Sequence, residues 1–331
     1  MRKLATSLLT VVLLSLGCSL WAQQAPAPQN PAHPDSAHPN SAKDAQSEPV
    51  ETLKVDVKLV NVFVTVTDAH GAPIGGLTKE NFAVAEDGFA QKISVFDKES
   101  ELPISLALAI DTSLSTRQDL PLEQASAKRF VRTIFRPVDA FAVYAFSEVV
   151  NEATHGFISN LKQIEEGIDH IRVGAATALY DAIYLASRAL DRRQGRKVIV
   201  LITDGGDTIS KVDYKEALRA AEEAEALVYS IIIVPIESSA GREIGGEHAL
   251  IQISEDTGGK YYYATSTTQL DDAFRKISDE LRTQYLLAYY PSQRTSFSDF
   301  RHIAVKVTGV ADASAYQVRH RAGYYTVKSE F

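Results

Sequence analysis

Cysteine is almost absent from this chain of 331 residues, in which Cys18 is the only one. A single thiol cannot form an intramolecular disulfide, and it cannot supply the thiolates of a Cys-based zinc site. The chain also lacks a dense cluster of Lys and Arg, and its formal net charge is -8. Because a nucleic-acid-binding surface needs such basic residues to displace counterions from phosphates, we expect no nucleic-acid partner.

Apolar runs of about 18 residues, which could span a bilayer as a helix, are missing after the N-terminal region, so we predict no transmembrane helix there. At the N-terminus, two basic residues precede a shorter apolar run at 8–16, and Ala22 is a small residue suited to cleavage. This pattern predicts a signal peptide over residues 1–22 and export to the periplasm or the medium. Residues 15–18 partly resemble a lipobox, so a lipid anchor through Cys18 is the alternative.

Two regions of β pattern lie far apart in the chain. Residues 23–50 are rich in Pro, Ala, Gln, Asn and Ser, which predicts a disordered linker. Residues 51–100 then alternate apolar and polar side chains, and Asp87-Gly88 between two apolar runs predicts a hairpin. The β pattern returns over residues 285–328. We expect the two regions to pair into one discontinuous β-sandwich, because the first alone would leave exposed strand edges; two separate β appendages are the alternative.

The region 102–284 between them has a different pattern of apolar and polar residues. The runs 104–110 and 198–202 are almost continuously apolar, which is typical of strands buried on both faces of a parallel sheet. Apolar residues at helical spacing lie between the strands and predict helices, including a short one at 251–255 and a last one at 267–284. This alternation predicts a doubly wound α/β fold with a mostly parallel sheet, flanked by the smaller β-sandwich-like region.

Three polar segments carry the chemistry of this region. Residues 111–115, Asp-Thr-Ser-Leu-Ser, directly follow one buried run, and residues 203–207, Thr-Asp-Gly-Gly-Asp, directly follow the other. Residues 174–182 form a junction between a loop and a helix. In an open α/β sheet, ligands bind beyond the carboxyl ends of the strands, where we expect all three segments to meet.

These segments resemble the metal-ion-dependent adhesion site of the von Willebrand factor A (VWA) superfamily, which consists of D-x-S-x-S, a Thr and an Asp in that order. The resemblance covers about residues 102–284. The sequence around the motif is similar to the bacterial VWFA-related family first noted in Acidobacteria, and this similarity extends over nearly the whole mature chain. That similarity rests on the segments NVFVTVTDAHGAPIGGLTKENFAVAEDG, TALYDAIYLA, YLLAYYP and AGYY.

The resemblance implies a set of metal ligands. Ser113 and Ser115 would coordinate the ion through their hydroxyls, Thr177 directly or nearly so, and Asp111 and Asp204 directly or through water. Mg²⁺ is the ion that we expect, with Mn²⁺ or Ca²⁺ as alternatives.

Such a ligand set favours recognition over catalysis. Mg²⁺ takes six oxygen ligands and keeps waters readily, and only two carboxylates stand beside it here. The ion therefore retains positive character, and an Asp or Glu of a protein partner can complete its coordination. We predict metal-dependent adhesion or envelope assembly and no enzyme activity, because no His or Glu is placed by the sequence as a general base. A structural envelope subunit with an incidental metal and, less favoured, a metal-dependent hydrolase are the alternatives.

Three further expectations concern the surroundings of the site. Asp181, one helical turn beyond Thr177, either hydrogen-bonds to the metal ligands or is a solvated carboxylate that the helix dipole favours. Residues 241–247 predict a polar loop, which either borders the site or is plain surface. By analogy with integrin-like relatives, the last helix over 267–284 would move when a ligand carboxylate binds.

Overall fold

The computed structural model describes the chain from residue 59 to residue 326, except for residues 99–101, 235–243, 294–298 and 312. The predicted signal peptide over 1–22, which includes Cys18, and the linker over 23–50 therefore lie outside the described residues.

A six-stranded sheet forms the centre of the α/β region, in the order β10-β9-β8-β5-β6-β7. Five of these strands are parallel, and the edge strand β7 runs antiparallel to β6. The strands are β5 (Ile104–Asp111), β6 (Ala140–Phe146), β7 (Val150–Glu152), β8 (Arg196–Thr203), β9 (Ala226–Ile233) and β10 (Lys260–Ala264). Every residue of β5 is buried, which confirms that the apolar run 104–110 is an inner strand.

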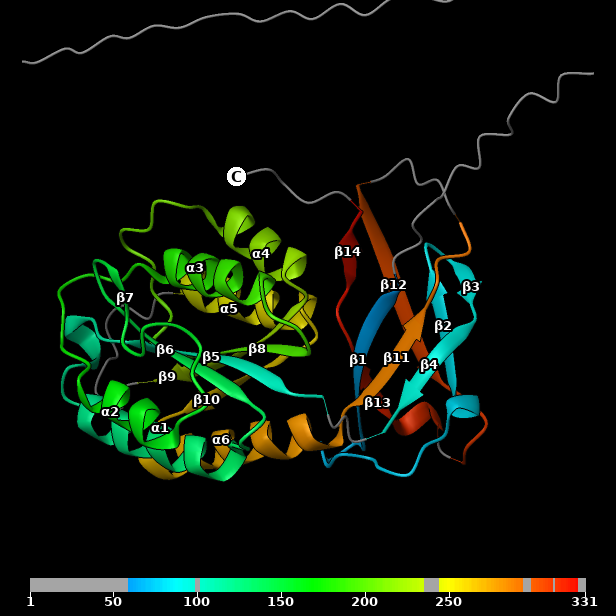
Figure 1. Ribbon diagram of the computed structural model, residues 1–331, viewed down its shortest axis with the longest axis horizontal. Coiled ribbons are helices and arrows are strands. Elements are labelled where there is room, and N and C mark those ends of the chain that lie inside the picture. The colour runs from blue at the N-terminus through cyan, green and yellow to red at the C-terminus, as the bar shows by residue number, and fades with distance from the viewer. Residues whose placement is uncertain (1–58, 99–101, 235–243, 294–298, 312, 327–331) are drawn as a thin grey trace, which may run out of the picture. The chain divides into compact units, whose positions relative to one another are not determined.

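Helices cover both faces of this sheet (Figure 1). One face carries α1 (Leu120–Ile134), α2 (Leu161–Asp169) and α6 (Thr267–Thr283), and the other carries α3 (Leu179–Asp191), α4 (Tyr214–Glu223) and α5 (Ile244–Asp256). Side chains alternate along β5, so that Leu106 and Leu108 pack in the core under the first group and Ala107 under the second. The doubly wound fold with a mostly parallel sheet is thus confirmed. Among the described helices, none is both long and apolar enough to cross a membrane.

One helix boundary differs from the prediction, and one strand was missed. The expected short helix at 251–255 is wrong in length, since α5 already begins at Ile244. Helix α4 begins at Tyr214 because Asp213 and Glu216 form a capping box, in which each side chain accepts the other's backbone N–H at 2.9 and 2.8 Å. Strand β7 is short and largely polar, so no apolar pattern marked it.

The N- and C-terminal β segments pair with each other in two four-stranded sheets. One has the order β13-β1-β11-β4 and the other β14-β12-β2-β3. Their strands are β1 (Val60–Thr67), β2 (Phe82–Glu86), β3 (Phe89–Gln91), β4 (Ile93–Asp97), β11 (Tyr285–Tyr289), β12 (Phe300–Val307), β13 (Gln317–Arg319) and β14 (Gly323–Tyr325). Antiparallel pairing of β1 with β11 and of β2 with β12 rules out two separate appendages. The predicted hairpin is also confirmed, because Asp87 and Gly88 have φ of 49° and 84° between β2 and β3.

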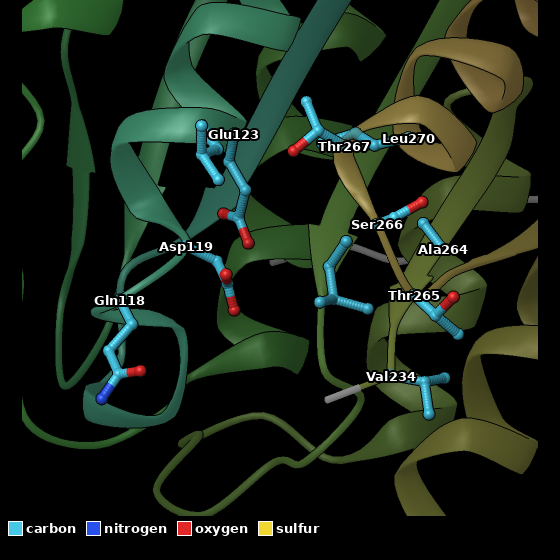
Figure 2. A pocket seen from close by; sticks show the side chains of 11 residues that line it. Gln118, Asp119, Glu123, Val234, Ala264, Thr265, Ser266, Thr267 and Leu270 are labelled. Carbon is cyan, nitrogen blue, oxygen red and sulfur yellow. The ribbon is translucent and has the colours of Figure 1, made fainter. Parts of the chain in front are cut away.

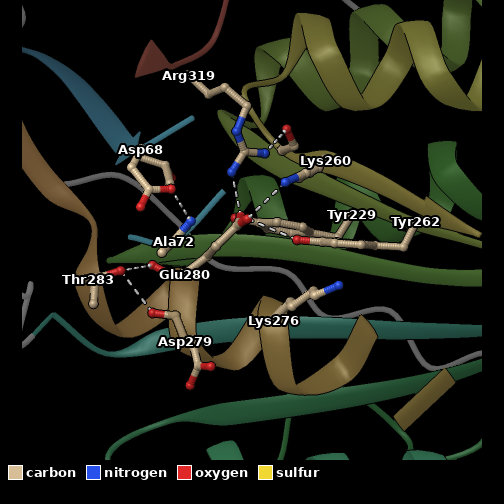
Figure 3. Close-up of polar contacts among 12 residues, drawn as sticks. Asp68, Ala72, Tyr229, Lys260, Tyr262, Lys276, Asp279, Glu280, Thr283 and Arg319 are labelled. Carbon is tan, nitrogen blue, oxygen red and sulfur yellow. Dashed lines mark hydrogen bonds and ion pairs between the residues drawn. The ribbon is translucent and has the colours of Figure 1, made fainter. Parts of the chain in front are cut away.

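A polar cluster joins the end of α6 to the sandwich (Figure 3). Glu280 is 2% exposed and accepts hydrogen bonds from Tyr262 at 2.9 Å and from Arg319 of β13 at 2.5 Å. Gln284, which follows α6, donates to the hydroxyl of Thr65 in β1 at 3.1 Å. The C-terminal end of α6 is therefore fixed by buried polar contacts, because leaving any of these groups unpaired in the interior costs free energy.

Candidate metal site

Asp111 is the last residue of β5 and is fully buried at the carboxyl edge of the sheet. One carboxylate oxygen accepts the backbone N–H of Ser113 at 2.8 Å, and the other accepts the hydroxyl of Thr203 at 2.7 Å. Thr203 ends β8, the neighbouring parallel strand, so the strand pairing itself brings it there. The two hydrogen bonds fix the orientation of the carboxylate and leave further lone pairs on each oxygen.

Ser113 and Ser115 lie on the tight loop that follows Asp111. Residues Leu114–Thr116 form a short 3-10 helix, and the hydroxyl of Thr116 donates to the backbone oxygens of Asp111 and Ser113 at 3.2 and 3.1 Å. The hydroxyls of Ser113 and Ser115 are hydrogen-bonded to each other, and their oxygens are 2.9 Å apart. Adjacent ligands of an octahedral Mg²⁺ with bonds of 2.0–2.1 Å are also separated by about 2.9 Å. The spacing of the two hydroxyls therefore fits a shared Mg²⁺ ion.

Asp204 follows β8 and is half-buried. It has no hydrogen bond or ion pair with any residue that the structure describes, although its charge is close enough to raise the pKa of Asp111. The next residue, Gly205, has φ of 101° and lies against the start of α5, where a Cβ on Gly246 would be 1.5 Å from the Gly205 oxygen. The loop of Asp204 is thus held in place while its carboxylate is left without a protein partner.

Thr177 lies on the loop before α3 and is 5% exposed. Its backbone N–H donates to the Thr208 hydroxyl at 2.9 Å, and its carbonyl accepts the N–H of Thr208 at 2.8 Å. Gly174 of the same loop donates to the carbonyl of Thr112 at 2.7 Å. The loop is therefore bonded to both other segments, and the hydroxyl of Thr177 forms no hydrogen bond with a described residue. The structure thus places Asp111 at the end of β5 and the other four predicted residues on three loops that hydrogen bonds connect.

Burial changes the acid–base behaviour of Asp111. Loss of hydration raises its pKa to about 6, the hydrogen bonds from Thr203 and Ser113 act in the opposite direction, and the charge of Asp204 raises it slightly further. A divalent cation beside Asp111 would stabilise the ionised form. Among the described residues, no three Asp, Glu, His or Cys side chains converge in a way that could hold a metal ion. Any metal at this edge would depend on hydroxyl ligands in addition to Asp111 and Asp204.

Glu123 of α1 is a residue that the sequence analysis missed. It is 2% exposed, and neither of its carboxyl oxygens has a hydrogen-bond partner among the described residues. Burial, followed by the charges of Asp111, Asp119 and Asp204, raises its pKa to about 8. The helical spacing in the sequence indicates that Glu123 faces the core. It lies three residues after Leu120 and four before Ala127, which are both buried on the same face of the helix.

Two aspartates near the site, Asp207 and Asp181, accept hydrogen bonds from backbone N–H groups and so stabilise the loops. Asp207 accepts the N–H of Leu179 at 2.8 Å and so caps α3. Asp181 accepts the N–H groups of Lys211 and Val212 at 2.9 and 3.0 Å. Asp181 lies in the first turn of α3, as one of its two predicted roles requires, and its carboxylate bonds to the segment after β8 and to none of the predicted metal ligands.

The predicted polar loop at 241–247 is partly helix. Residues 241–243 lie outside the described residues, and α5 begins at Ile244. The contact of Gly246 with Gly205 brings this helix against the loop of Asp204. This part of the segment therefore borders the candidate site, and glycine is required there because any side chain would collide with the loop.

Comparisons with known proteins add a family. Residues 106–206 match a family model described as von Willebrand factor type A domain. No curated protein matches the chain. Among solved structures, a conserved hypothetical protein named BatB from Bacteroides thetaiotaomicron is 21% identical with a TM-score of 0.44, over 54% of this chain and 100% of that one.

Two further structures are similar to a comparable degree. A von Willebrand factor type A protein from Catenulispora acidiphila is 12% identical with a TM-score of 0.48, over 76% of this chain and 70% of that one. The PilB minor pilin from Streptococcus sanguinis is 14% identical with a TM-score of 0.44, over 55% of this chain and 62% of the pilin, so the match spans less than two thirds of the pilin's length.

Proposed function

The chain contains a von Willebrand factor type A domain, and from this premise we propose that the domain binds a protein partner through a divalent cation. The ligands of the cation are Asp111, Ser113, Ser115, Thr177 and Asp204, and an Asp or Glu of the partner completes its coordination. Mg²⁺ suits these donors best, and Mn²⁺ or Ca²⁺ are compatible with them. When bound, the cation supplies the positive charge that attracts the partner's carboxylate.

The separation of 2.9 Å between the hydroxyls of Ser113 and Ser115 is the observation that carries this proposal. It matches the edge of a Mg²⁺ coordination octahedron, and the pre-oriented Asp111 lies at the start of the same loop. Asp204 adds a second carboxylate that no described residue neutralises. The two carboxylates formally match the charge of a divalent ion, and the other ligands are neutral hydroxyls and water, so a partner's carboxylate can replace a water without the repulsion that three or four direct carboxylates would cause.

Exposed apolar side chains around the site support a protein partner. Leu114 is 57% exposed between the two serines, and Ile209 is 52% exposed on the loop after β8. Val149, at the turn between β6 and β7, and Val173, on the loop before Thr177, are also exposed. Apolar residues that surround a polar anchor are common in protein–protein interfaces, whereas a site for free ions has no need of them.

We also propose that the protein acts outside the cytoplasm, on the basis of the signal peptide predicted over residues 1–22. Soluble export is the first interpretation, and a lipid anchor on Cys18 is the second. Assignment to the bacterial VWFA-related family likewise stays a prediction. Mass spectrometry of the mature protein would distinguish the two forms, because cleavage after Ala22 removes Cys18, whereas lipidation retains it as the modified first residue.

Isothermal titration with Mn²⁺ tests the metal site. Wild-type protein should bind one ion, and both Asp111→Ala and Asp204→Ala should lose the binding heat. Asp169→Ala is the matched control, since it removes an exposed carboxylate of α2 whose ion pair with Lys128 contributes little stability. Equal heats from wild type and Asp111→Ala would overturn the proposal.

Affinity capture from envelope extracts tests the partner. Wild-type protein should retain a partner that a chelator releases, and Asp204→Ala should fail to retain it. If Asp204→Ala captures the same partner in the presence of chelator, the domain is a structural subunit and its metal is incidental.

Glu123 provides one observation in favour of a second candidate function, a metal-dependent hydrolase. A buried carboxyl group near Asp111 and Asp204 is the kind of group that could act as a general base, and its pKa of about 8 suits proton transfer near neutral pH. A panel of ester and phosphoester substrates with Mn²⁺ tests this alternative. Activity that is absent in the wild type, or that Glu123→Gln leaves unchanged, would exclude this role of Glu123.

A further inference from the structure

A pocket of about 250 Å³ opens at the same edge of the sheet as the candidate metal site (Figure 2). One wall comes from the start of α1 and the residues before it, and the other comes from the carboxyl ends of β9 and β10 and the start of α6. The pocket and the metal site are electrostatically connected, because the charges of Asp111 and Asp204 act on Glu123 in the pocket.

Glu123 lies at the buried end of this pocket. Figure 2 shows its carboxyl group directed into the space between Asp119 and the residues at the start of α6. Glu123 is 2% exposed and both of its oxygens lack a hydrogen-bond partner in the part of the chain that the structure describes, whereas Asp119 is exposed at the mouth. A buried carboxyl group without a partner costs stability, so it calls for an explanation beyond packing.

The walls determine which ligand could pair with this acid. Leu122 and Leu270 provide apolar surface along the pocket, and the hydroxyl-bearing residues Thr265 and Ser266 stand at its opposite rim. A flexible aliphatic chain with a positively charged end matches this order of surfaces, since its stem would pack on the leucines and its head would reach Glu123. A metal ion does not match it, because the carboxyl groups of the described residues do not converge as a metal cluster.

We propose that this pocket receives a Lys or Arg side chain of the partner, with Glu123 as its buried counter-ion and Asp119 as the attracting charge at the mouth. The partner would then present a basic residue to the pocket and an acidic residue to the metal. This assignment to a protein partner rests on the proposed function, but the pocket itself needs no metal to bind a cation. Burial, followed by the charges of Asp111, Asp119 and Asp204, raises the pKa of Glu123 to about 8, and these negative charges also favour an incoming positive charge.

Binding of n-butylguanidine tests the pocket without knowledge of the partner. Titration calorimetry or ligand-observed NMR is performed at pH 8.5 in chelator, and n-butylurea serves as the neutral ligand of the same shape. Wild-type protein should bind the guanidinium at least tenfold more tightly than the urea. Glu123→Gln, which preserves the shape of the side chain, should lose this preference, and Asp119→Asn should weaken it.

Metal titrations on the same variants separate the two proposals. Glu123→Gln should bind Mn²⁺ as the wild type does, and Asp204→Ala should lose Mn²⁺ but still bind n-butylguanidine. Equal binding of guanidinium and urea by the wild type, or unchanged guanidinium binding by Glu123→Gln, would overturn the pocket assignment. A loss of Mn²⁺ binding in Glu123→Gln would also overturn it, since Glu123 would then belong to the metal. If Mn²⁺ fails to bind the wild type while n-butylguanidine binds through Glu123, only the metal proposal falls.

Discussion

Buried carboxylates differ in their hydrogen-bond and ion-pair partners between the sandwich and the rim of the α/β sheet. In the sandwich, Glu86 is 2% exposed, forms an ion pair with Arg301 at 2.5 Å, and accepts the hydroxyls of Tyr289 and Tyr324 at 2.8 and 2.9 Å. At the rim, Glu123 is equally buried, and no residue that the structure describes forms a hydrogen bond with its carboxyl group. The chain therefore pairs its buried acids where they only support the fold, and an unpaired acid indicates a place where a ligand is expected to supply the charge.

Helix α6 connects the two environments. Its first residues line the pocket of Glu123, and Glu280 near its last turn pairs with Arg319 of the sandwich. The movement of the last helix that integrin-like relatives undergo would here break this buried ion pair and the bond from Gln284 to Thr65. We therefore expect ligand binding in this chain to affect the first turn of α6 more than its last.

Removal of a paired acid should have the largest effect. Glu86→Ala leaves the guanidinium of Arg301 buried without its counter-ion, so the free energy of unfolding should fall by about 3–5 kcal/mol. Urea denaturation at pH 7, followed by far-UV circular dichroism, measures this change. A loss of unfolding free energy below about 1 kcal/mol is the range of an exposed ion pair. It would show that pairing in the sandwich contributes little, and it would contradict the proposed difference between the two regions.

Removal of the unpaired acid should have the opposite sign. The pKa of Glu123 is about 8 in the folded protein against a model value of 4.5, so its bound proton contributes stability below pH 4.5 that is lost as pH rises to 8. In chelator at pH 8.5, Glu123→Gln should therefore raise the free energy of unfolding by about 2–4 kcal/mol. At pH 4.5 the gain should nearly vanish, and an equal gain at both pH values would contradict the explanation by charge.

The smallest expected effect concerns the pH dependence of metal binding. The pKa of Asp111 is about 6, and a metal requires its ionised form. The affinity for Mn²⁺ should therefore fall by about tenfold between pH 7 and pH 5, with uptake of one proton on release of the ion. Calorimetry in buffers of different ionisation enthalpy measures both quantities. An affinity that stays constant over this range would place Asp111 outside the coordination of the ion.

Several features of the fold could be predicted because they depend on neighbouring residues. The apolar run 198–202 predicted an inner strand, and Asp87-Gly88 predicted a hairpin, since each pattern lies within a few neighbouring positions. The start of α5 at Ile244 was missed because residues 244–246 read Ile-Gly-Gly, and glycine pairs usually disfavour a helix. A tertiary contact explains the glycine at this position, because a Cβ on Gly246 would lie 1.5 Å from the oxygen of Gly205 in the loop of Asp204.

The sequence by itself determined the alternation of strands and helices through its periodicity, apart from the short strand β7, and its resemblance to the VWA superfamily implied the five candidate ligands. Only the tertiary structure decided that Glu123 is buried without a partner and faces the start of α6, more than 140 residues later in the chain. The spacing of Glu123 on its helix indicates the core-facing side, but its lack of a counter-ion depends on what the distant segments bring to it. A local pattern cannot report this, since burial and pairing arise from contacts between elements that the fold assembles.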